Sequence, residues 1–429
     1  MPFASLGLSP SLVHAALQQG YATPTPIQTA AIAAVLQGHD VLGAAQTGSG
    51  KTAAFALPLL QRVQEHQRTA APGPRRVRAL VLVPTRELAA QVGEVLRSLA
   101  QHLKPQPKVA IVFGGVSINP QMLGLRGGAD IVVATPGRLL DLVEHNALRL
   151  NTVAHLVLDE ADRLLDLGFA QELESVLALL PAPRQNLFFS ATFPAAVQSL
   201  ADGLLIDPVR VEVPDTPGNA PVIAQRAVAV DPARRTQLLR HFIKEEGWSR
   251  VLVFVATQYA AEHVAEKLYK AGIFATPFHG GLSQGARKQV LQEFKDERWQ
   301  VVVTTDLAAR GLDIAQLPAV VNYDLPRSAV DYVHRIGRTG RAGESGTAMT
   351  FVTPEAETHF RLIEKRQHLA LPREVVAGFE PDPASAAPTS ATDPHGTGGI
   401  KGKRPSKKDK LRASEAAAAV AGKLPGDGF

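Results

Sequence analysis

The sequence contains no cysteine, few aromatic residues and no long apolar run. The absence of cysteine excludes disulfide scaffolds, Cys-ligated zinc, iron–sulfur clusters and thiol nucleophiles. It is compatible with a reducing, intracellular setting. A membrane-spanning helix needs roughly 18 to 20 apolar residues, whereas the longest apolar runs here have the length of a strand. We therefore expect a protein without a membrane segment.

Lysine and arginine are missing from the first 50 positions. A secretory signal begins with a positively charged segment, and transit peptides are rich in arginine. Since neither signature is present, the sequence predicts a cytoplasmic protein. The 429 residues allow two or three domains. The net charge of +5 is too small to identify a class of partner.

Short β-branched apolar segments alternate with helical patterns such as 86–102 and 137–144. This alternation is typical of a parallel sheet covered by helices on both faces. The segment 214–221 holds three prolines and one glycine and interrupts the pattern, as a linker does. The expected strands are 41–44, 79–83, 109–113, 131–134, 155–158 and 186–189 before the linker, and 251–255, 274–277, 301–304, 319–322 and 348–352 after it.

This organisation predicts an α/β protein with two tandem parallel-sheet lobes, at 1–213 and 222–375, joined by the linker. Residues 376–429 are expected to form a disordered basic tail, because they are rich in Pro, Ala, Ser, Thr and Gly. Within 398–412, seven basic residues and one acid give a charge of +6, so the rest of the chain sums to about −1. This cluster is either a solvated tail or a sequence-independent contact for a polyanion.

A glycine-rich segment, Ala45-Gln-Thr-Gly-Ser-Gly-Lys-Thr52, follows the first expected strand and precedes a helical pattern. Backbone N–H groups in such a turn, and the start of the helix behind it, bind phosphate. Lys51 then reaches the outer phosphates, and the hydroxyl of Thr52 holds Mg²⁺. The usual pattern has glycine at the position of Ala45, but the flanking elements still predict a nucleotide site.

Acidic residues in Asp159-Glu-Ala-Asp162 follow the expected strand 155–158. A buried strand that ends in acids brings a carboxylate to Mg²⁺ beside a phosphate loop. We expect Asp159 to hold the metal, through water, and Glu160 to act as general base toward the attacking water. Helix capping is the alternative explanation for acids after a strand.

Together these segments resemble the DEAD-box ATP-dependent RNA helicases, whose name is the tetrapeptide at 159–162. The resemblance extends from residue 3 to about residue 370, and within the family the RhlE-like bacterial branch is the nearest. It implies two RecA-like lobes with a cleft for ATP and RNA between them. The family's other motifs follow in order at 20–28, 84–89, 114–115, 135–138, 190–192, 253–257, 284–287, 304–313 and 334–341.

Recognition of adenine requires a flat surface and an amide that pairs with a donor and an acceptor on the base edge. The resemblance makes Gln28 the adenine selector and places Tyr21 beside the base. Phe3 is the isolated upstream aromatic residue, with an ordinary core anchor as the alternative. The complete nucleotide set is Phe3, Tyr21, Gln28, Gln46, Thr47, Gly48, Ser49, Gly50, Lys51, Thr52, Gly311 and Asp313.

The second lobe has no phosphate loop of its own, so we expect it to complete the site of the first. Arg338 and Arg341 are three residues apart and can point the same way, which suits arginine fingers on the γ-phosphoryl group. The remaining expected residues connect the nucleotide to the cleft. Asp162 is expected to bond Ser190 and Thr192, with a helix N-cap by Thr192 as the alternative, and His334 and Arg335 are expected to couple the lobes.

The remaining motifs supply small hydroxyls, glycines and single arginines, which bind phosphate and sugar oxygens. Only 5% of the residues are aromatic, which argues against an extended base-stacking platform. The resemblance implies sequence-independent binding of RNA, with 2′-hydroxyl contacts. Each residue could instead be a turn or a cap. The expected RNA contacts are Thr85, Arg86, Gly115, Thr135, Arg138, Thr257, Gly280, Arg287 and Thr305.

The expected activity is RNA-stimulated ATP hydrolysis, with ATP and Mg²⁺ as cofactors, coupled to lobe closure and local, non-processive unwinding. Three alternatives remain: a DNA translocase, an ATP-gated RNA clamp or scaffold, and an ATPase that acts through partners bound by its tail. The resemblance also implies ribosome-assembly or RNA-decay proteins as partners and a monomeric core.

Overall fold

The computed structural model describes residues 2–44, 49–69, 73–212, 223–309, 317–340 and 345–382, which belong to one compact unit that ends at Asp382. The expected linker and most of the expected tail, 383–429, lie outside these residues. Within the unit the chain forms two α/β lobes, each built on a seven-stranded sheet. Every strand pair in both sheets is parallel, as predicted.

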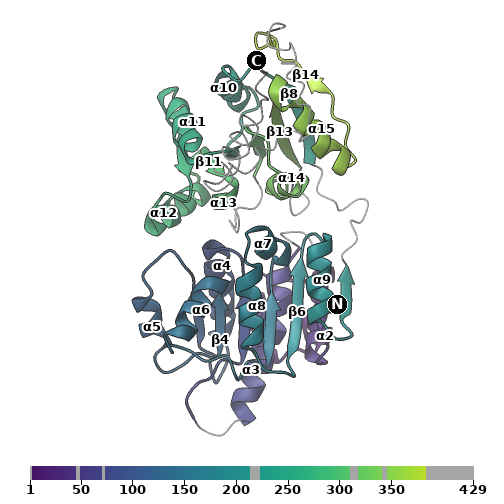
Figure 1. The fold of residues 1–429 in the computed structure, drawn as a ribbon, viewed down its shortest axis with the longest axis vertical. Helices are drawn as coiled ribbons and strands as arrows, with labels where there is room; N and C mark the ends of the chain where they lie inside the picture. Colours follow the sequence, from purple (N-terminus) through teal and green to yellow (C-terminus); the bar gives the residue numbers. More distant parts are fainter. Residues whose placement is uncertain are drawn as a thin grey trace, which may run out of the picture. The chain divides into compact units, whose positions relative to one another are not determined.

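The first lobe has the strand order β3-β4-β2-β5-β6-β1-β7. Its strands are β1 Val41–Ala44, β2 Ala79–Leu82, β3 Val109–Val112, β4 Ile131–Ala134, β5 His155–Leu158, β6 Gln185–Ser190 and β7 Val209–Glu212. Its helices are η1 Phe3–Leu6, α1 Pro10–Gln18, α2 Pro26–Leu36, α3 Lys51–Thr69, α4 Arg86–Ala100, α5 Asn119–Leu125, α6 Pro136–Glu144, α7 Ala161–Asp166, α8 Ala170–Ala178 and α9 Ala195–Leu204 (Figure 1).

The second lobe repeats this arrangement with the order β10-β11-β9-β12-β13-β8-β14. Its strands are β8 Ile223–Ala229, β9 Val251–Val255, β10 Ala275–Phe278, β11 Val301–Thr305, β12 Ala319–Asn322, β13 Gly346–Val352 and β14 Arg373–Glu374. Its helices are α10 Arg235–Glu245, α11 Gln258–Lys270, α12 Gln284–Lys295, α13 Asp306–Ala309, α14 Ala329–Ile336, η2 Pro354–Ala356 and α15 Glu357–Arg366.

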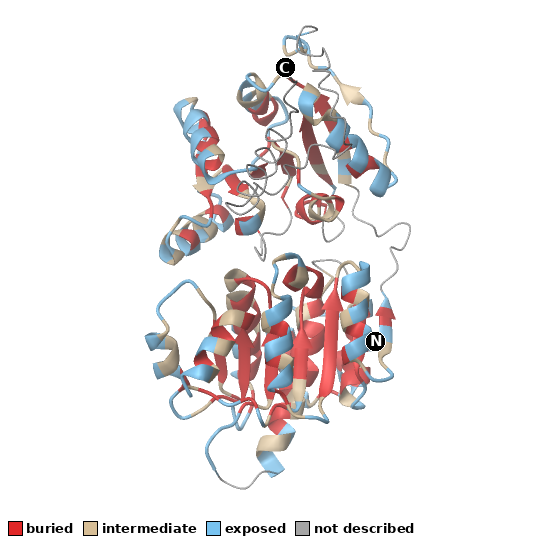
Figure 2. Ribbon diagram, viewed as in Figure 1, coloured by how far each residue is buried: buried red, intermediate tan, exposed pale blue. Residues whose placement is uncertain are grey.

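Burial on both faces explains why the strands are continuously apolar. In β2, Ala79 and Val81 face the core beneath α1 to α4, while Leu80 and Leu82 face the core on the opposite side of the sheet. Successive side chains of a strand point to opposite faces, so a sheet with helices on both sides needs apolar residues at every position. Figure 2 shows the strands of the first lobe buried and exposed residues on α8.

The structure differs from the predicted boundaries at the end of the second lobe. The predicted boundary was at 375, yet Val376 and Phe379 pack against the second-lobe core, and the backbone N–H of Asp382 donates to Asp231 at 3.0 Å. These apolar contacts hold the segment to the lobe despite its polar composition. Strands β7, β8 and β14 were not predicted, because their partly exposed positions interrupt the apolar pattern. Across the described ranges, no helix is long and apolar enough to cross a membrane.

Candidate functional site

Most of the expected site residues of the first lobe lie where strands end. Lys51 follows β1, Thr85 follows β2, Thr135 follows β4 and Asp159 follows β5, while Ser190 is the last residue of β6. Because the carboxyl ends of parallel strands meet at one edge of the sheet, the fold gathers these motifs there. The carboxyl edge of the first-lobe sheet is therefore the candidate site.

The phosphate-binding segment is fixed at its end by two side chains of the upstream segment. The hydroxyl of Thr25 donates to the carbonyl of Ser49 at 2.9 Å, and the amide nitrogen of Gln28 donates to the carbonyl of Gly50 at 3.2 Å. Helix α3 begins at Lys51, whose side chain is only 7% exposed. The free N–H groups at the start of this helix suit an anion. Gln46, Thr47 and Gly48 lie outside the described residues.

Gln28 is 3% exposed, and both ends of its amide are engaged. Its oxygen accepts from the backbone N–H of Thr25 at 2.9 Å, while its nitrogen bonds Gly50. A primary amide has two donor hydrogens and two acceptor lone pairs, so one of each remains for a base. The structure therefore shows Gln28 joining the upstream segment to the phosphate loop, and its reading of adenine stays a prediction.

The two expected aromatic neighbours of the base differ in exposure. Tyr21 is partly buried and packs at the rim of the first-lobe core. Phe3 is 2% exposed and lies inside that core. The structure therefore favours the core-anchor alternative, and contact between Phe3 and nucleotide stays a prediction.

Asp159 and Glu160 lie in a buried, polar corner beside Lys51. Burial raises the pKa of Asp159 to about 6, although the charge of Lys51 opposes the shift. The backbone of Glu160 is left-handed, with φ 52°, which is uncommon outside glycine and is found at functional sites. Although Glu160 precedes α7, its side chain makes no cap, so the capping alternative fails at this residue.

The donors present fit a magnesium ion that arrives with a nucleotide. Among the described residues no group of three or more metal-ligating side chains forms a protein-only site. Magnesium commonly uses one or two carboxylates with phosphate oxygens and water, and it does not require a protein-only cage. Asp159 is 3% exposed, and burial disfavours its charged form, which a bound cation would stabilise. Thr52 occupies the second position of α3. These two residues would hold the ion.

Asp162 is hydrogen-bonded to the segment that ends β6, as expected. Its Oδ2 accepts from the hydroxyl of Thr192 at 2.8 Å and from the backbone N–H of Thr192 at 3.0 Å. Its own backbone N–H donates to the hydroxyl of Ser190 at 3.3 Å. Helix α9 begins after Pro194, so the alternative that Thr192 is an N-cap is wrong.

The same carboxylate faces a histidine of the second lobe. The Nε2 of His334 lies 3.8 Å from Oδ2 of Asp162, a distance too long for a hydrogen bond but within the range of an ion pair. Burial would raise the pKa of Asp162, but His334 and the hydroxyl of Thr192 hold it well below its usual range. Burial lowers the pKa of His334, and Asp162 opposes that shift. Asp162 therefore stays ionised beside a histidine whose charged form is disfavoured by burial.

A second contact between the lobes lies beside the first. The Nη1 of Arg163 is 2.7 Å from Oδ1 of Asp331, and their side chains are 4% and 13% exposed. Asp331 and His334 lie one turn apart on α14, and their respective partners, Arg163 and Asp162, are adjacent on α7. Sequence reasoning missed Arg163 and Asp331, although the spacing of Asp331 and His334 could have indicated a shared helix face.

Arg335, on α14, and Arg338, two residues after its end, have different partners. Arg338 is 7% exposed and lines a small cavity together with Arg163 and His334. Arg335 instead points into its own lobe, where it pairs with Asp306 and donates to Asn322 at 3.0 Å. Arg335 also lines the cavity that holds Arg338 and Arg163, so its coupling of the lobes stays a prediction. Arg341, Gly311 and Asp313 lie outside the described residues.

The expected RNA-binding residues of the first lobe form hydrogen bonds within its loops. The hydroxyl of Thr85 caps α4 by accepting from Leu88 at 3.2 Å, and that of Thr135 accepts from Gly114 at 3.3 Å. The guanidinium of Arg138 donates to the carbonyl of Val116 at 2.7 Å, and that of Arg86 to Gly115 at 3.5 Å. These bonds fix the shape of the loops, and contact with RNA stays a prediction.

In the second lobe, Thr257 caps α11 by accepting from Ala260 at 3.1 Å and is exposed. Gly280 is also exposed, whereas Thr305 is partly buried. Arg287 is 3% exposed and pairs with Glu87 of the first lobe at 3.0 Å. An RNA phosphate would have to displace Glu87 from Arg287, so Glu87 is a further residue that sequence reasoning missed.

Two family models match the two lobes. The first, described as DEAD/DEAH box helicase, matches residues 25–200, and the second, described as helicase conserved C-terminal domain, matches residues 234–343. The first match contains β1 to β6 of the first-lobe sheet, and the second contains β9 to β12 of the second-lobe sheet. The matches therefore agree with the division into lobes that the structure shows.

Named relatives agree with these models. The chain is 41% identical over 370 residues to ATP-dependent RNA helicase DeaD of Escherichia coli, covering 86% of this chain but 58% of that protein. It is 40% identical to DEAD-box ATP-dependent RNA helicase CshA of Bacillus cereus, covering 85% and 67%. The solved structure of Saccharomyces cerevisiae Dbp5 bound to RNA and ADP BeF3 is 29% identical, with a TM-score of 0.76 over 87% of this chain and 95% of that chain.

Proposed function

Because the chain belongs to the DEAD-box family of RNA helicases, we propose that it hydrolyses ATP to ADP and phosphate and uses the reaction to open short RNA duplexes or remodel RNA–protein complexes. The chain spans little more than half the length of DeaD, so this proposal concerns the two-lobed core. The proposed location in the cytoplasm, the monomeric core, the RhlE-like branch and the ribosome-assembly or RNA-decay partners rest on the sequence alone.

The observation that carries the proposal is the position of Asp162. This carboxylate bonds Thr192 in its own lobe, faces His334 in the second lobe and lies three residues from Asp159. A change at the nucleotide that moves α7 would shift Asp162 against Thr192 and against His334. Such a shared element is what an energetic link between an ATP site and a lobe interface requires.

ATP hydrolysis is assigned to the corner beside Lys51. The ammonium group of Lys51 and the start of α3 would hold the phosphates, and the carboxylate of Glu160 would take a proton from the attacking water. Asp159 and Thr52 would position Mg²⁺, which, when bound, neutralises phosphate charge. Arg338, and Arg341 beyond the described residues, would stabilise charge on the γ-phosphoryl group from the second lobe.

RNA binding is proposed for the loops that carry Thr85, Arg138, Thr257 and Arg287, together with their neighbours. These groups suit sugar and phosphate oxygens, so recognition would be largely independent of sequence. ATP and RNA each favour the closed lobes because each contacts both, and this shared preference makes their binding cooperative. Release after hydrolysis would limit each cycle to local, non-processive strand separation.

The decisive experiment compares ATP turnover by the full chain with and without single-stranded RNA, and with DNA of the same sequence. We expect RNA, and not DNA, to stimulate turnover at least tenfold, and Glu160→Gln to reduce it at least a hundredfold while ATP and RNA still bind. Glu174→Gln is the matched control, because Glu174 is an exposed acid on α8. Equal stimulation by DNA would support a translocase, and unchanged turnover in Glu160→Gln would support a clamp.

A further inference from the structure

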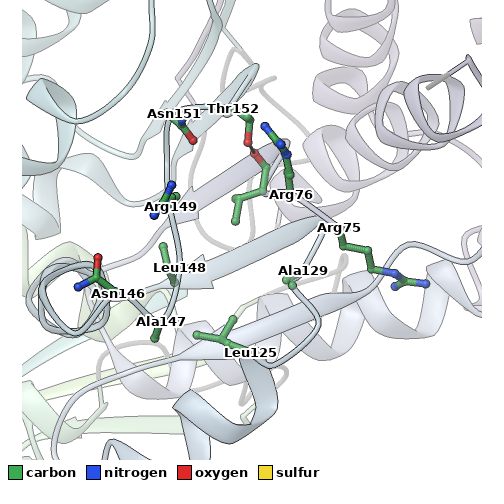
Figure 3. Close-up of a pocket in the computed structure, with 12 residues that line it drawn as sticks. Arg75, Arg76, Leu125, Ala129, Asn146, Ala147, Leu148, Arg149, Asn151 and Thr152 are labelled. Carbon is green, nitrogen blue, oxygen red and sulfur yellow. Dashed lines mark hydrogen bonds between the residues drawn. The ribbon is translucent and has the colours of Figure 1, made fainter. Parts of the chain in front are cut away.

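A cavity of about 310 Å³ lies in the first lobe at the edge of the sheet opposite the candidate site. Three loops form it, and each leads into a strand: Arg75 to Val77 into β2, Gly128 and Ala129 into β4, and Ala147 to Thr152 into β5. The amino ends of three adjacent parallel strands therefore surround it. Figure 3 shows the lining side chains.

The loops are held in place by bonds that leave the cavity open. The hydroxyl of Thr152 donates to the carbonyl of Val77 at 3.0 Å, which ties the β5 loop to the β2 loop. Gly128 has φ 78°, and any side chain there would strike the carbonyl of Arg75. The β4 loop thus needs glycine in order to approach the β2 loop. This geometry fixes the cavity independently of any ligand.

The floor of the cavity is aliphatic, and its polar groups are amides, hydroxyl and guanidinium. Val77, Leu125, Ala129 and Leu148 are buried and form the floor. Three arginines, Arg75, Arg76 and Arg149, line it as well, and none of its twelve lining residues is acidic. Such a combination of apolar surface with a few polar groups is typical of ligand pockets of this size.

Two of the three arginines are available to bind an anionic ligand. Arg75 pairs with the buried Asp130 at 3.2 Å, and in Figure 3 its guanidinium points away from the other labelled side chains. Arg76 and Arg149 are exposed, and neither forms an ion pair or hydrogen bond with its side chain in the part of the chain that the structure describes. The side-chain amides of Asn146 and Asn151 have no partner among the described residues either.

Positive charge continues beyond this cavity. A neighbouring hollow of about 440 Å³ shares Arg75 and is lined by Arg97 and Lys108. Arg97 is paired with Glu94 at 3.0 Å, and Lys108 donates to the carbonyl of Arg126 at 3.2 Å. An anionic ligand that fills the first cavity would therefore meet further cations along its path.

We propose that this cavity docks an acidic peptide segment of a partner protein, with one aliphatic or aromatic side chain of the peptide on the floor. The forked guanidiniums of Arg76 and Arg149 would bind carboxylates, and the amides of Asn146 and Asn151 would bond the peptide backbone. RNA fits less well, because no aromatic side chain lines the cavity for base stacking and the aliphatic floor would stay unfilled by phosphate.

The docked peptide would leave the candidate RNA surface free. The chain runs through β2 from Arg76 at the cavity to Thr85 at the opposite edge. Nine residues at about 3.3 Å each span roughly 30 Å. A partner bound here could therefore attach the core to a larger assembly while it works. The inference does not depend on the proposed ATPase activity.

The test uses the full chain and a fluorescein-labelled peptide with the sequence Glu-Asp-Leu-Glu-Asp. We expect saturable binding by fluorescence anisotropy and shifts of the Leu125 and Leu148 methyl signals in NMR spectra. The double variant Arg76→Ala, Arg149→Ala should bind at least tenfold more weakly, as expected for the loss of two charge-assisted contacts. Its RNA-stimulated ATP turnover should equal that of the unmodified chain.

Matched controls separate the outcomes. Arg210→Ala removes another exposed arginine of the same lobe and should leave peptide binding unchanged. A peptide with serine in place of leucine should bind at least fivefold more weakly. The proposal is overturned if the acidic peptide does not bind, if the leucine makes no difference, or if a uridine decamer or inorganic phosphate moves the two methyl signals as strongly as the peptide does.

Discussion

At the scale of single residues, two aspartates three positions apart have opposite electrostatic environments. Burial raises the pKa of Asp159 to about 6, whereas His334 and Thr192 hold the pKa of Asp162 well below its usual range despite burial. Opposite shifts in neighbouring carboxylates indicate different roles. The positive charge of Lys51 does not offset the cost of burying the Asp159 carboxylate. Asp162 stays ionised and faces His334 of the second lobe.

Asp159→Asn should stabilise the nucleotide-free protein while abolishing ATP hydrolysis. A carboxyl group whose folded pKa of about 6 exceeds its unfolded value of 3.8 destabilises the fold when ionised. The penalty is complete above pH 6 and disappears as the pH falls toward 3.8. At pH 7.5 the substitution should raise the free energy of unfolding by about 3 kcal/mol, since one pKa unit corresponds to about 1.4 kcal/mol and the pKa is raised from 3.8 to about 6.

Urea denaturation without nucleotide or Mg²⁺ measures this difference at pH 7.5 and at pH 4.5. The gain should be clearly smaller at the lower pH. Asp202→Asn, at an exposed position of α9, is the control and should change stability by less than about 0.5 kcal/mol. A destabilised Asp159→Asn variant at pH 7.5 would contradict the electrostatic interpretation.

At the scale of elements, helices pack closely enough on the sheet to restrict side-chain size. Helix α4, which starts at the cap Thr85 and carries Arg86 and Glu87, lies directly on β3. A Cβ atom at Gly93 of this helix would overlap with the side chain of Ile111 in β3. The close approach sets the position of α4, and with it the loop at its start.

Gly93→Ala should therefore destabilise the protein even though alanine favours helices. The gain in helix propensity is about 1 kcal/mol, whereas overpacking a core typically costs about 1 to 3 kcal/mol. We expect a net loss of about 1 kcal/mol in urea denaturation. Combining Gly93→Ala with Ile111→Ala, which empties the contested space, should cost less than the sum of the two single changes. Additive losses would show that the two positions do not compete.

At the scale of the whole molecule, buried ion pairs connect two lobes that have separate cores. Arg163 with Asp331, and Arg287 with Glu87, each place a mostly buried charge of one lobe against the other. Removing one partner of a buried pair leaves an uncompensated charge. Such pairs therefore favour one arrangement of the two lobes more than they raise the stability of the fold. Glu87 and an RNA phosphate would also compete for Arg287, which makes RNA binding an exchange of partners.

Removing residues 383–429 should separate catalysis from RNA affinity. The truncated chain keeps every described residue of both lobes, so its turnover with saturating RNA should stay within twofold of the full chain. The seven basic residues of 398–412 give a charge of +6. If they contact phosphates, their loss should lower the slope of log affinity against log salt by up to about 4, since each phosphate contact contributes about 0.7 on single strands.

RNA binding measured between low and high salt tests this expectation. A full-length variant with those seven residues changed to glutamine is the matched control and should reproduce the smaller slope. An unchanged slope would support the alternative that the tail is only a solvated segment. Loss of turnover in the truncated chain would instead support an activity that depends on the tail.

The sequence alone determined the parts of this protein whose signals are local. Continuous apolar runs such as Val251–Val255 predicted buried parallel strands, and the order of the glycine-rich segment and Asp159-Glu-Ala-Asp162 predicted which strand ends carry the site. The hydrogen bonds that join Asp162 to Ser190 and Thr192 were also expected and are present. Short-range patterns suffice here because parallel strands bring their carboxyl ends to one edge.

Only the tertiary structure decided which side chains meet across long stretches of chain. Arg163 and Asp331 are 168 residues apart, and nothing local in either segment identifies the other. The same holds for the core position of Phe3, the inward turn of Arg335 and the cavity formed by three separate loops. These features depend on packing between distant segments, and a residue's neighbours in sequence carry no information about that packing.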